Sequence, residues 1–437
     1  MTSTAQAIGM RRRSLLGVAA AAGLVGAASA CEEEPAAAPA PASAPPLIPT
    51  DWASVRAQFA VDPQIAHLST FVFAPHPAPV RASIERHRAG LDADAIGYLH
   101  ENEARLDERV AVAAADYLDA RLDDIAFTDS TTMGLGLLYS GLRLGPGDEV
   151  LTTEHDFYAT HESLRLRAER DGATVRRARL YADPAAASTD EIVGNLTRAV
   201  TARTKVVAVT WVHSSTGVKL PIRAMADALR GRGVLLCVDA VHGFGAEDAS
   251  PGDLGCDFLV SGCHKWLLGP RGTGLVWGST EGWARFTPLI PTFDGRSIGA
   301  WLGFDGGATP PGPAATPGGY HSFEHRWALA EAFDFHKAIG RPRVAARTHE
   351  LATALKDGLA GIGGLKLMTP KSPDLSAGVV CCQVPEVSVD EAVARLRGLK
   401  VVASATPYRP TLLRFGTTIV NNEADVEATV KAARTLV

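Results

Sequence analysis

The sequence predicts an α/β protein with a largely parallel, seven-stranded sheet, followed by a smaller C-terminal α+β domain. Two observations support this fold class. Short apolar runs alternate with longer segments of helical periodicity between residues 125 and 278, and several runs are apolar almost throughout. Such runs are typical of strands covered on both faces of a doubly wound sheet. A chain of 437 residues has room for one large domain and a smaller one.

Each strand of the large sheet is assigned to one apolar run. The runs are IAFTD (125–129), EVLTTEH (149–155), TVRRARL (174–180), KVVAVTWV (205–212), LLCVDAV (235–241), DFLVSG (257–262) and GLVWG (274–278). The helices expected between them span residues 131–142, 161–171, 190–202 and 222–231. In such a sheet ligands gather at the carboxyl ends of the strands.

The C-terminal part begins after a Gly- and Pro-rich segment at 291–320, which we expect to be a long functional loop. A helix is expected over 322–339. The runs VVCCQVP, LKVVASA and TLLRFGT and helices at 346–360, 388–397 and 423–436 predict a small α+β domain. The predicted domains are therefore 51–320, an N-terminal segment with the large domain, and 321–437.

Residues 1–31 have the pattern of a signal peptide, with three arginines, an apolar run and a small-residue exit. Arg12-Arg13 followed by SLL resembles a twin-arginine export signal, with a Sec signal or a weak membrane anchor as alternatives. The sequence therefore predicts export to the periplasm.

The exit from this segment allows two outcomes. Ala28-Ser29-Ala30 suits cleavage after Ala30, and the following Cys31 suits attachment of a lipid. That lipid is the only membrane contact we expect. Residues 32–50 are rich in Ala and Pro and predict an unfolded linker.

Composition excludes some classes of function. The net charge of −5 gives no electrostatic reason to expect a nucleic-acid partner. The six cysteines form no C-x-x-C pair, so we expect buried free thiols rather than disulfides or a metal site.

Two strand ends carry the residues of a possible site. Asp239 ends one apolar run, His242 follows it, and Lys265 comes directly after the run DFLVSG. The ends open toward the same edge of the sheet, so Asp239 and Lys265 can form a plain ion pair or hold the two ends of pyridoxal phosphate. In the second case the amine forms a Schiff base with the aldehyde, and the carboxylate keeps the ring nitrogen protonated.

The stretches VDAVHG (238–243) and SGCHKWLLGPRGTG (261–274) together resemble the class V aminotransferase family of pyridoxal phosphate enzymes, over roughly residues 67–433. Members include cysteine desulfurases and isopenicillin-N-epimerase-like proteins. The resemblance implies the fold-type I aminotransferase architecture, pyridoxal 5'-phosphate as cofactor, a small amino acid substrate and a homodimer.

The resemblance also implies a phosphate site. Thr132 in TDSTTMG matches the phosphate-contacting threonine, with Thr131 and Met133 adding backbone donors. A simple helix cap is the alternative. His264 matches another phosphate contact, and Thr273 is expected near the cofactor at the dimer boundary.

The remaining matches concern the ring and the substrate. His155 resembles the residue that stacks on the ring, and Ser214 and His242 resemble contacts of the ring hydroxyl. Arg414 resembles the arginine that binds the substrate α-carboxylate, with a surface arginine as the alternative. Arg326 is a candidate second anion binder, and neither it nor His325 receives a defined role.

The resemblance fixes the cofactor better than the reaction. It implies an enzyme that acts at the α-carbon of an amino acid, as an aminotransferase or an epimerase, with Lys265 as covalent partner and proton shuttle and Asp239 and His155 as catalytic companions. A C–S lyase or cysteine desulfurase is an alternative, although the loop at 401–410 has no cysteine nucleophile. An exported ligand-binding protein without turnover is another.

Overall fold

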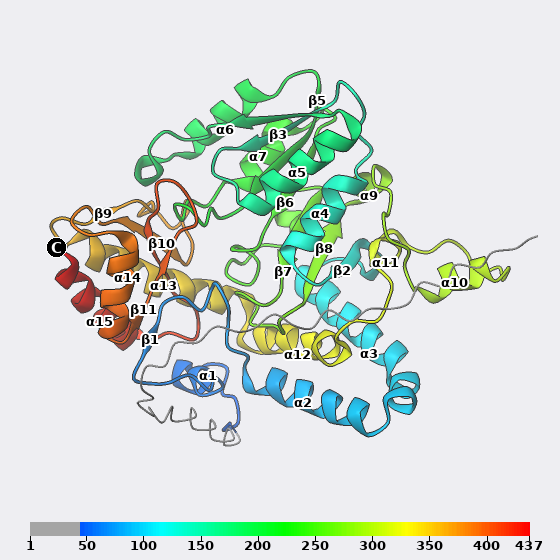
Figure 1. Cartoon of the computed structure of the whole chain (residues 1–437), viewed down its shortest axis with the longest axis horizontal. Helices are drawn as coiled ribbons and strands as arrows, with labels where there is room; N and C mark the ends of the chain where they lie inside the picture. Colours follow the sequence, from blue (N-terminus) through cyan, green and yellow to red (C-terminus); the bar gives the residue numbers. More distant parts are fainter. Residues whose placement is uncertain (1–43) are drawn as a thin grey trace, which may run out of the picture. The chain divides into compact units, whose positions relative to one another are not determined.

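A seven-stranded mixed sheet forms the centre of the computed structural model, which describes residues 44–437 (Figure 1). The strands follow the order β2 (Ile125–Thr128), β8 (Gly274–Gly278), β7 (Phe258–Gly262), β6 (Leu235–Asp239), β5 (Thr204–Thr210), β3 (Glu149–Thr153) and β4 (Thr174–Ala178). All neighbouring pairs are parallel except those of β8, which is antiparallel to both β2 and β7. The predicted α/β fold is confirmed, and each of the seven predicted runs contains a strand.

The signal peptide, Cys31 and most of the predicted linker lie outside the described residues. Within residues 44–437, no helix is both long and apolar enough to cross a membrane. The five cysteines of this part are free and buried, as predicted.

Helices cover both faces of the large sheet, which explains its nearly continuous apolar strands. In β5, Val206 and Ala208 face one core, while Val207 and Val209 face the other, because successive side chains of a strand point to opposite faces. The first core includes α4 (Thr131–Gly141) and α5 (Tyr158–Asp171). The second includes α3 (Ala95–Leu118), α6 (Thr189–Ala199), α7 (Ile222–Leu229) and α12 (Phe323–Ile339).

Several helices lie where no element was predicted. The helices α1 (Trp52–Arg56), α2 (Ala78–Ala93) and α3 precede the first predicted strand, and α8 (Pro251–Leu254) and α9 (Thr280–Ala284) are single turns between strands. The segment predicted as a long loop contains α10 (Gly295–Trp301) and α11 (Pro311–Ala315). Asp294 caps α10 by accepting a hydrogen bond from the Arg296 N–H, and a proline begins α11.

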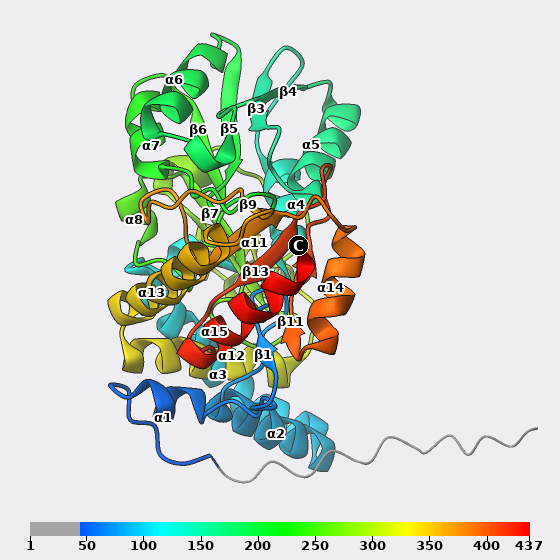
Figure 2. The same cartoon turned by 90° about the vertical axis from the view of Figure 1, so that its left-hand side faces the viewer.

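The C-terminal residues form a second sheet with the order β12 (Ser404–Ala405), β13 (Leu413–Gly416), β10 (Val379–Gln383) and β9 (Lys366–Leu367), antiparallel throughout. The helices α13 (Arg341–Ala360), α14 (Val389–Gly398) and α15 (Glu423–Ala433) lie with it (Figure 2). A contribution from the other end of the chain was not expected. Strand β1 (Ala66–His67) pairs with β11 (Val401–Val402), and the Gly416 N–H donates to the Leu68 carbonyl at 2.7 Å.

A tight turn at 213–218 joins this second sheet to the first. The Gly217 N–H donates to the His213 carbonyl at 2.7 Å, and Gly217 has a positive φ of 77°. A Cβ at this position would lie 2.5 Å from the Val379 carbonyl oxygen and 2.6 Å from Thr369 Oγ1. Only glycine fits both the backbone conformation and the space.

Gly217→Ala is expected to lower the melting temperature more than Gly231→Ala. Both glycines have a positive φ, so each alanine carries a backbone cost of about 1–2 kcal/mol. A Cβ at Gly231 meets no atom within 4 Å, whereas the clash at 217 adds about 1–3 kcal/mol. Scanning calorimetry of the two purified variants measures the difference. Equal losses would show that the turn does not hold the two sheets together.

Candidate active site

The predicted site residues meet at one edge of the large sheet. Asp239 is the last residue of β6, Lys265 follows the neighbouring β7 by three residues, and His155 follows β3 by two. Ser214 follows β5, which lies between β6 and β3. These four strands are parallel, so their carboxyl ends share this edge.

Burial makes the Lys265 amine less basic than an exposed lysine. Its Nζ lies 3.5 Å from Nε2 of His242, and the Trp266 indole N–H donates to His242 Nδ1 at 3.1 Å. Because the indole can only donate, Nδ1 is an acceptor, and the single proton of the neutral imidazole is on Nε2, facing the amine. Burial lowers the pKa of Lys265 to about 8, Asp239 opposes this change, and Arg414 adds to it. Burial also lowers the pKa of His242.

Asp239 is a buried acid at the carboxyl end of β6. It is 1% exposed, and its Oδ1 accepts the Val241 N–H at 3.0 Å. Burial raises its pKa to about 7, the Val241 hydrogen bond and Lys265 lower it, and Asp156 raises it further. Asp239 and Lys265 each shift the pKa of the other, so they interact electrostatically. No ion pair within residues 44–437 joins them, so they are not in direct contact.

A second buried acid lies next to this pair and was not predicted. Asp156 accepts hydrogen bonds from the Thr152 hydroxyl and the Thr210 N–H, both at 2.7 Å, and lies 3.7 Å from His213 Nε2. Burial alone would raise its pKa, but the nearby His213 and the hydrogen bonds from the Thr152 hydroxyl and the Thr153 N–H lower it to about 2. The Tyr181 hydroxyl lies 2.8 Å from His213 Nδ1. Asp156 therefore carries a negative charge near pH 7, close enough to affect Asp239.

His155 stacks on Tyr181, with ring centroids 4.1 Å apart and an interplanar angle of 6°. Burial lowers the pKa of His155 to about 4, so its ring is neutral near pH 7. Its Nε2 is buried and has no partner among the described residues. Stacking on a cofactor ring stays a prediction, because the stacked ring in this structure is Tyr181.

The first turn of α4 lies beside the lysine loop. The Gly262 N–H donates to Thr131 Oγ1 at 2.7 Å, and a Cβ at Gly262 would lie 2.9 Å from Cε1 of His264. Gly262 therefore lets His264 approach the start of α4. Thr132 is exposed there, as a phosphate contact requires. The Met133 N–H, expected to face an anion, donates instead to the capping Ser130 hydroxyl at 3.1 Å.

Thr273 supports the loop that carries Lys265. Its hydroxyl donates to the Pro270 carbonyl at 2.5 Å, its carbonyl accepts the Cys263 N–H at 2.9 Å, and it is 2% exposed. The hydroxyl is thus used within its own loop, and the expected position of Thr273 near the cofactor at the dimer boundary stays a prediction.

Arg414 places a buried cation next to Ser214 at the site edge. It is 7% exposed, its NH1 donates to the Ser214 carbonyl at 3.2 Å, and its guanidinium lies 5.1 Å from the centre of the Phe71 ring. No carboxylate pairs with it within residues 44–437. Buried charges are normally paired, so this guanidinium suits an anionic group of a ligand.

Ser214 Oγ lies 2.7 Å from the Tyr408 hydroxyl, and its expected contact with a ring hydroxyl stays a prediction. Tyr408 was not predicted, although it lies in the loop before Arg414 that the sequence had singled out for its lack of cysteine. Tyr408 could have been found in the sequence as the aromatic hydroxyl in the loop where a cysteine desulfurase would carry its cysteine nucleophile.

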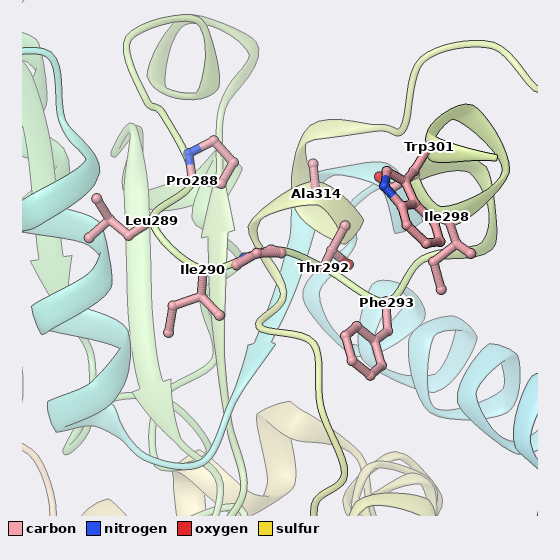
Figure 3. Close-up of a pocket in the computed structure, with 10 residues that line it drawn as sticks. Pro288, Leu289, Ile290, Thr292, Phe293, Ile298, Trp301 and Ala314 are labelled. Atoms are coloured by element: carbon pink, nitrogen blue, oxygen red, sulfur yellow. The ribbon is translucent and has the colours of Figure 1, made fainter. Parts of the chain in front are cut away.

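Two cavities lie away from this cluster. One of about 770 Å³ is lined by Ile290, Phe293, Ile298, Trp301 and neighbouring residues of the 288–314 segment, none of them a predicted site residue (Figure 3). The other, of about 290 Å³, contains Arg326, whose guanidinium lies 4.1 Å from the centre of the Phe127 ring. Burial lowers the pKa of Arg326 to about 10. Arg326 lines this cavity, and none of the predicted residues at the sheet edge does.

The residues at the sheet edge fit pyridoxal phosphate. A free amine at Lys265 suits its aldehyde, and the unpaired Asp239 suits a protonated ring nitrogen. The exposed Thr132 and the buried, unpartnered His264 Nδ1 lie together at a helix N-terminus, which suits its phosphate.

Comparison with known proteins agrees with this geometry. The model of the family "Aminotransferase class-V" matches residues 93–406. Isopenicillin N epimerase of Amycolatopsis lactamdurans is 29% identical over 412 residues, covering 89% of this chain and 100% of that protein. Probable cysteine desulfurase 2 of Mycobacterium leprae is 26% identical over 345 residues, covering 75% of this chain and 80% of that protein.

A solved structure of a C-DES mutant, with glycine covalently linked to its PLP cofactor, matches with a TM-score of 0.79 and 19% identity. The match covers 86% of this chain and 98% of that chain, and it shows a shared fold. The family match spans well over half of the chain. The chain therefore belongs to the class V aminotransferase family, and its cofactor is pyridoxal 5'-phosphate.

Proposed function

We propose that this enzyme epimerises an amino acid at its α-carbon. The observation that carries the proposal is the set of three groups at the sheet edge: an amine at Lys265, an acid at Asp239 and a buried, unpaired guanidinium at Arg414. An amino acid offers one carboxylate for the guanidinium and one α-hydrogen for the amine.

Each group has a defined task. Arg414 binds the substrate α-carboxylate through parallel N–H donors, which orients the α-carbon. Bound pyridoxal phosphate supplies a protonated ring that withdraws electron density from this carbon. Asp239 keeps the ring nitrogen protonated, and the fixed negative charge of Asp156 adds to the negative potential near Asp239. Lys265, whose pKa burial lowers to about 8, accepts the α-proton in its free-amine form.

The cysteines of the described chain favour epimerisation over desulfuration. Desulfuration needs an accessible thiolate near the substrate arginine. Cys381 is paired in register with Arg414 across β10 and β13, but it is 0% exposed, and burial raises its pKa to about 12. The loop before Arg414 presents Tyr408 instead.

Relatives support both chemistries, so product identity decides between them. The epimerase of A. lactamdurans matches over its whole length, and the desulfurase of M. leprae over 80%. A desulfurase or C–S lyase releases sulfide or a persulfide from a sulfur amino acid. An aminotransferase releases a keto acid, and a ligand-binding protein releases nothing.

The purified enzyme, loaded with pyridoxal phosphate, is expected to replace the α-hydrogen of isopenicillin N or of one L-amino acid in a panel by deuterium in D₂O and to form the D-epimer. NMR and chiral chromatography measure both events. Lys265→Ala should lower the rate by about 10²–10⁴-fold, because the proton acceptor is lost. The exposed Lys366→Ala serves as the matched control. Sulfide or keto acid without an epimer would contradict the proposal.

Asp239→Asn is expected to change the pH dependence of stability in the apoprotein. The Asp239 pKa rises from about 3.9 in an unfolded chain to about 7 in the fold. The folded state binds this proton more tightly, so wild-type stability falls as pH rises from about 4 to about 7, by at most about 1.4 kcal/mol per pH unit. The asparagine variant lacks this component.

Urea unfolding of the apoprotein between pH 5 and 7.5 measures this effect, with the exposed Asp374→Asn as control. Adding pyridoxal phosphate should remove most of the fall, since a ring cation stabilises the carboxylate. Parallel curves for the wild type and Asp239→Asn would show that Asp239 has an ordinary pKa and is not held for a cation.

A further inference from the structure

The loop between β12 and β13 brings one side chain of the C-terminal domain into the site of the large domain. The Tyr408 hydroxyl lies 2.7 Å from Ser214 Oγ, and its ring packs edge-on against Phe157, with centroids 6.2 Å apart. The loop is closed by the Thr406 N–H, which donates to the Leu412 carbonyl at 2.9 Å, and by the Leu412 N–H, which donates to Thr406 Oγ1 at 2.8 Å. Tyr408 is therefore held in place.

Ser214 fixes Tyr408 relative to the proposed carboxylate site. Its hydroxyl bonds the phenol, and its carbonyl accepts from Arg414 NH1 at 3.2 Å. The phenol and the guanidinium thus share one anchoring residue.

Arg414 lies within electrostatic reach of both Tyr408 and Lys265. Its charge lowers the pKa of each, against burial in the case of Tyr408 and together with burial in the case of Lys265. A carboxylate bound to Arg414 therefore lies near both the lysine and the phenol. Lys265 follows β7 of the large sheet and Tyr408 lies between β12 and β13 of the second sheet, so the two groups come from different sheets.

Inversion at a carbon requires a proton to leave from one face and another to arrive on the opposite face. We propose that Tyr408 is the second acid–base residue of this reaction and delivers the proton on the face opposite Lys265, an inference that rests on the proposed epimerase function. Among the described residues at this edge, the Tyr408 side chain offers a neutral hydroxyl that is anchored, like Arg414, to Ser214. It reaches the site from the loop between β12 and β13.

The proton balance is simple. The α-C–H bond breaks, its proton goes to Lys265 Nζ, and the electron pair stays with the substrate. The O–H bond of Tyr408 then breaks, and its proton forms the new C–H bond with that pair. Lys265 returns a proton to solvent and the phenolate takes one up, so no oxidant or co-reactant is needed. Burial raises the pKa of Tyr408, so the phenol is protonated near pH 7 and ready to donate.

The test compares two events in D₂O for the amino acid that the wild type exchanges fastest. In Tyr408→Phe, formation of the D-epimer from the L-form should fall at least about 10²-fold, while deuterium should still enter the L-form within about threefold of the wild-type rate, because Lys265 is intact. The exposed Tyr158→Phe is the matched control and should change neither event. Affinity of the apoprotein for pyridoxal phosphate and the melting temperature should be unchanged in both variants.

The outcomes are separable. Epimer formation at the wild-type rate, or an equal fall of both events, would overturn the role of Tyr408. Absence of exchange in the wild type would instead remove the proposed function. If Tyr408→Phe does not fold, the wild type is tested with α-deuterated L-substrate in H₂O. Two separate acid–base groups give a D-epimer that contains no substrate deuterium. A single lysine that moves the proton between faces gives a D-epimer that retains part of the substrate deuterium.

Discussion

The structure depends on one constraint: two ionisable groups of opposite type are buried at adjacent strand ends without touching each other. Asp239 is 1% exposed, and burial raises its pKa, while burial lowers that of Lys265. Each is thus pushed toward its neutral form, which is unfavourable for a simple ion pair. A cofactor with a ring cation at one end and an aldehyde at the other satisfies both groups at once. Perturbed pKa values of this kind cluster at functional sites.

The surrounding residues keep this unfavourable arrangement in place. Asp156 is fixed as a carboxylate by Thr152, Thr210 and His213, and the Tyr181 hydroxyl holds the other nitrogen of that histidine. These hydrogen bonds orient the buried groups, which packing alone would not do. The turn around Gly217 then carries the second sheet to the site, so Arg414 and Tyr408 are positioned by the same backbone that holds Ser214.

The sequence was sufficient for the strands and for residues that end them. Asp239 and Lys265 follow apolar runs, and in parallel sheets such positions share an edge whatever the loops do. Tyr181 and Tyr408 could not be found in this way, because their roles arise from contacts with residues more than 30 positions away. Periodicity says nothing of such pairings. Likewise, Met133 and Thr273 were matched by motif, whereas local hydrogen bonds to Ser130 and Pro270 decide where their donors point. The pairing of β1 with β11 joins distant segments and left no local pattern.

The central claim is that the amine of residue 265 holds the cofactor. Reduction of the loaded enzyme with sodium borohydride, proteolysis and mass spectrometry test it most directly. We expect a phosphopyridoxyl group on the peptide that contains SGCHKWLLGPR, at its lysine, and on no other peptide of the chain. A label on a different lysine, or a cofactor lost on reduction and unfolding, would contradict the assignment of this sheet edge as the active site.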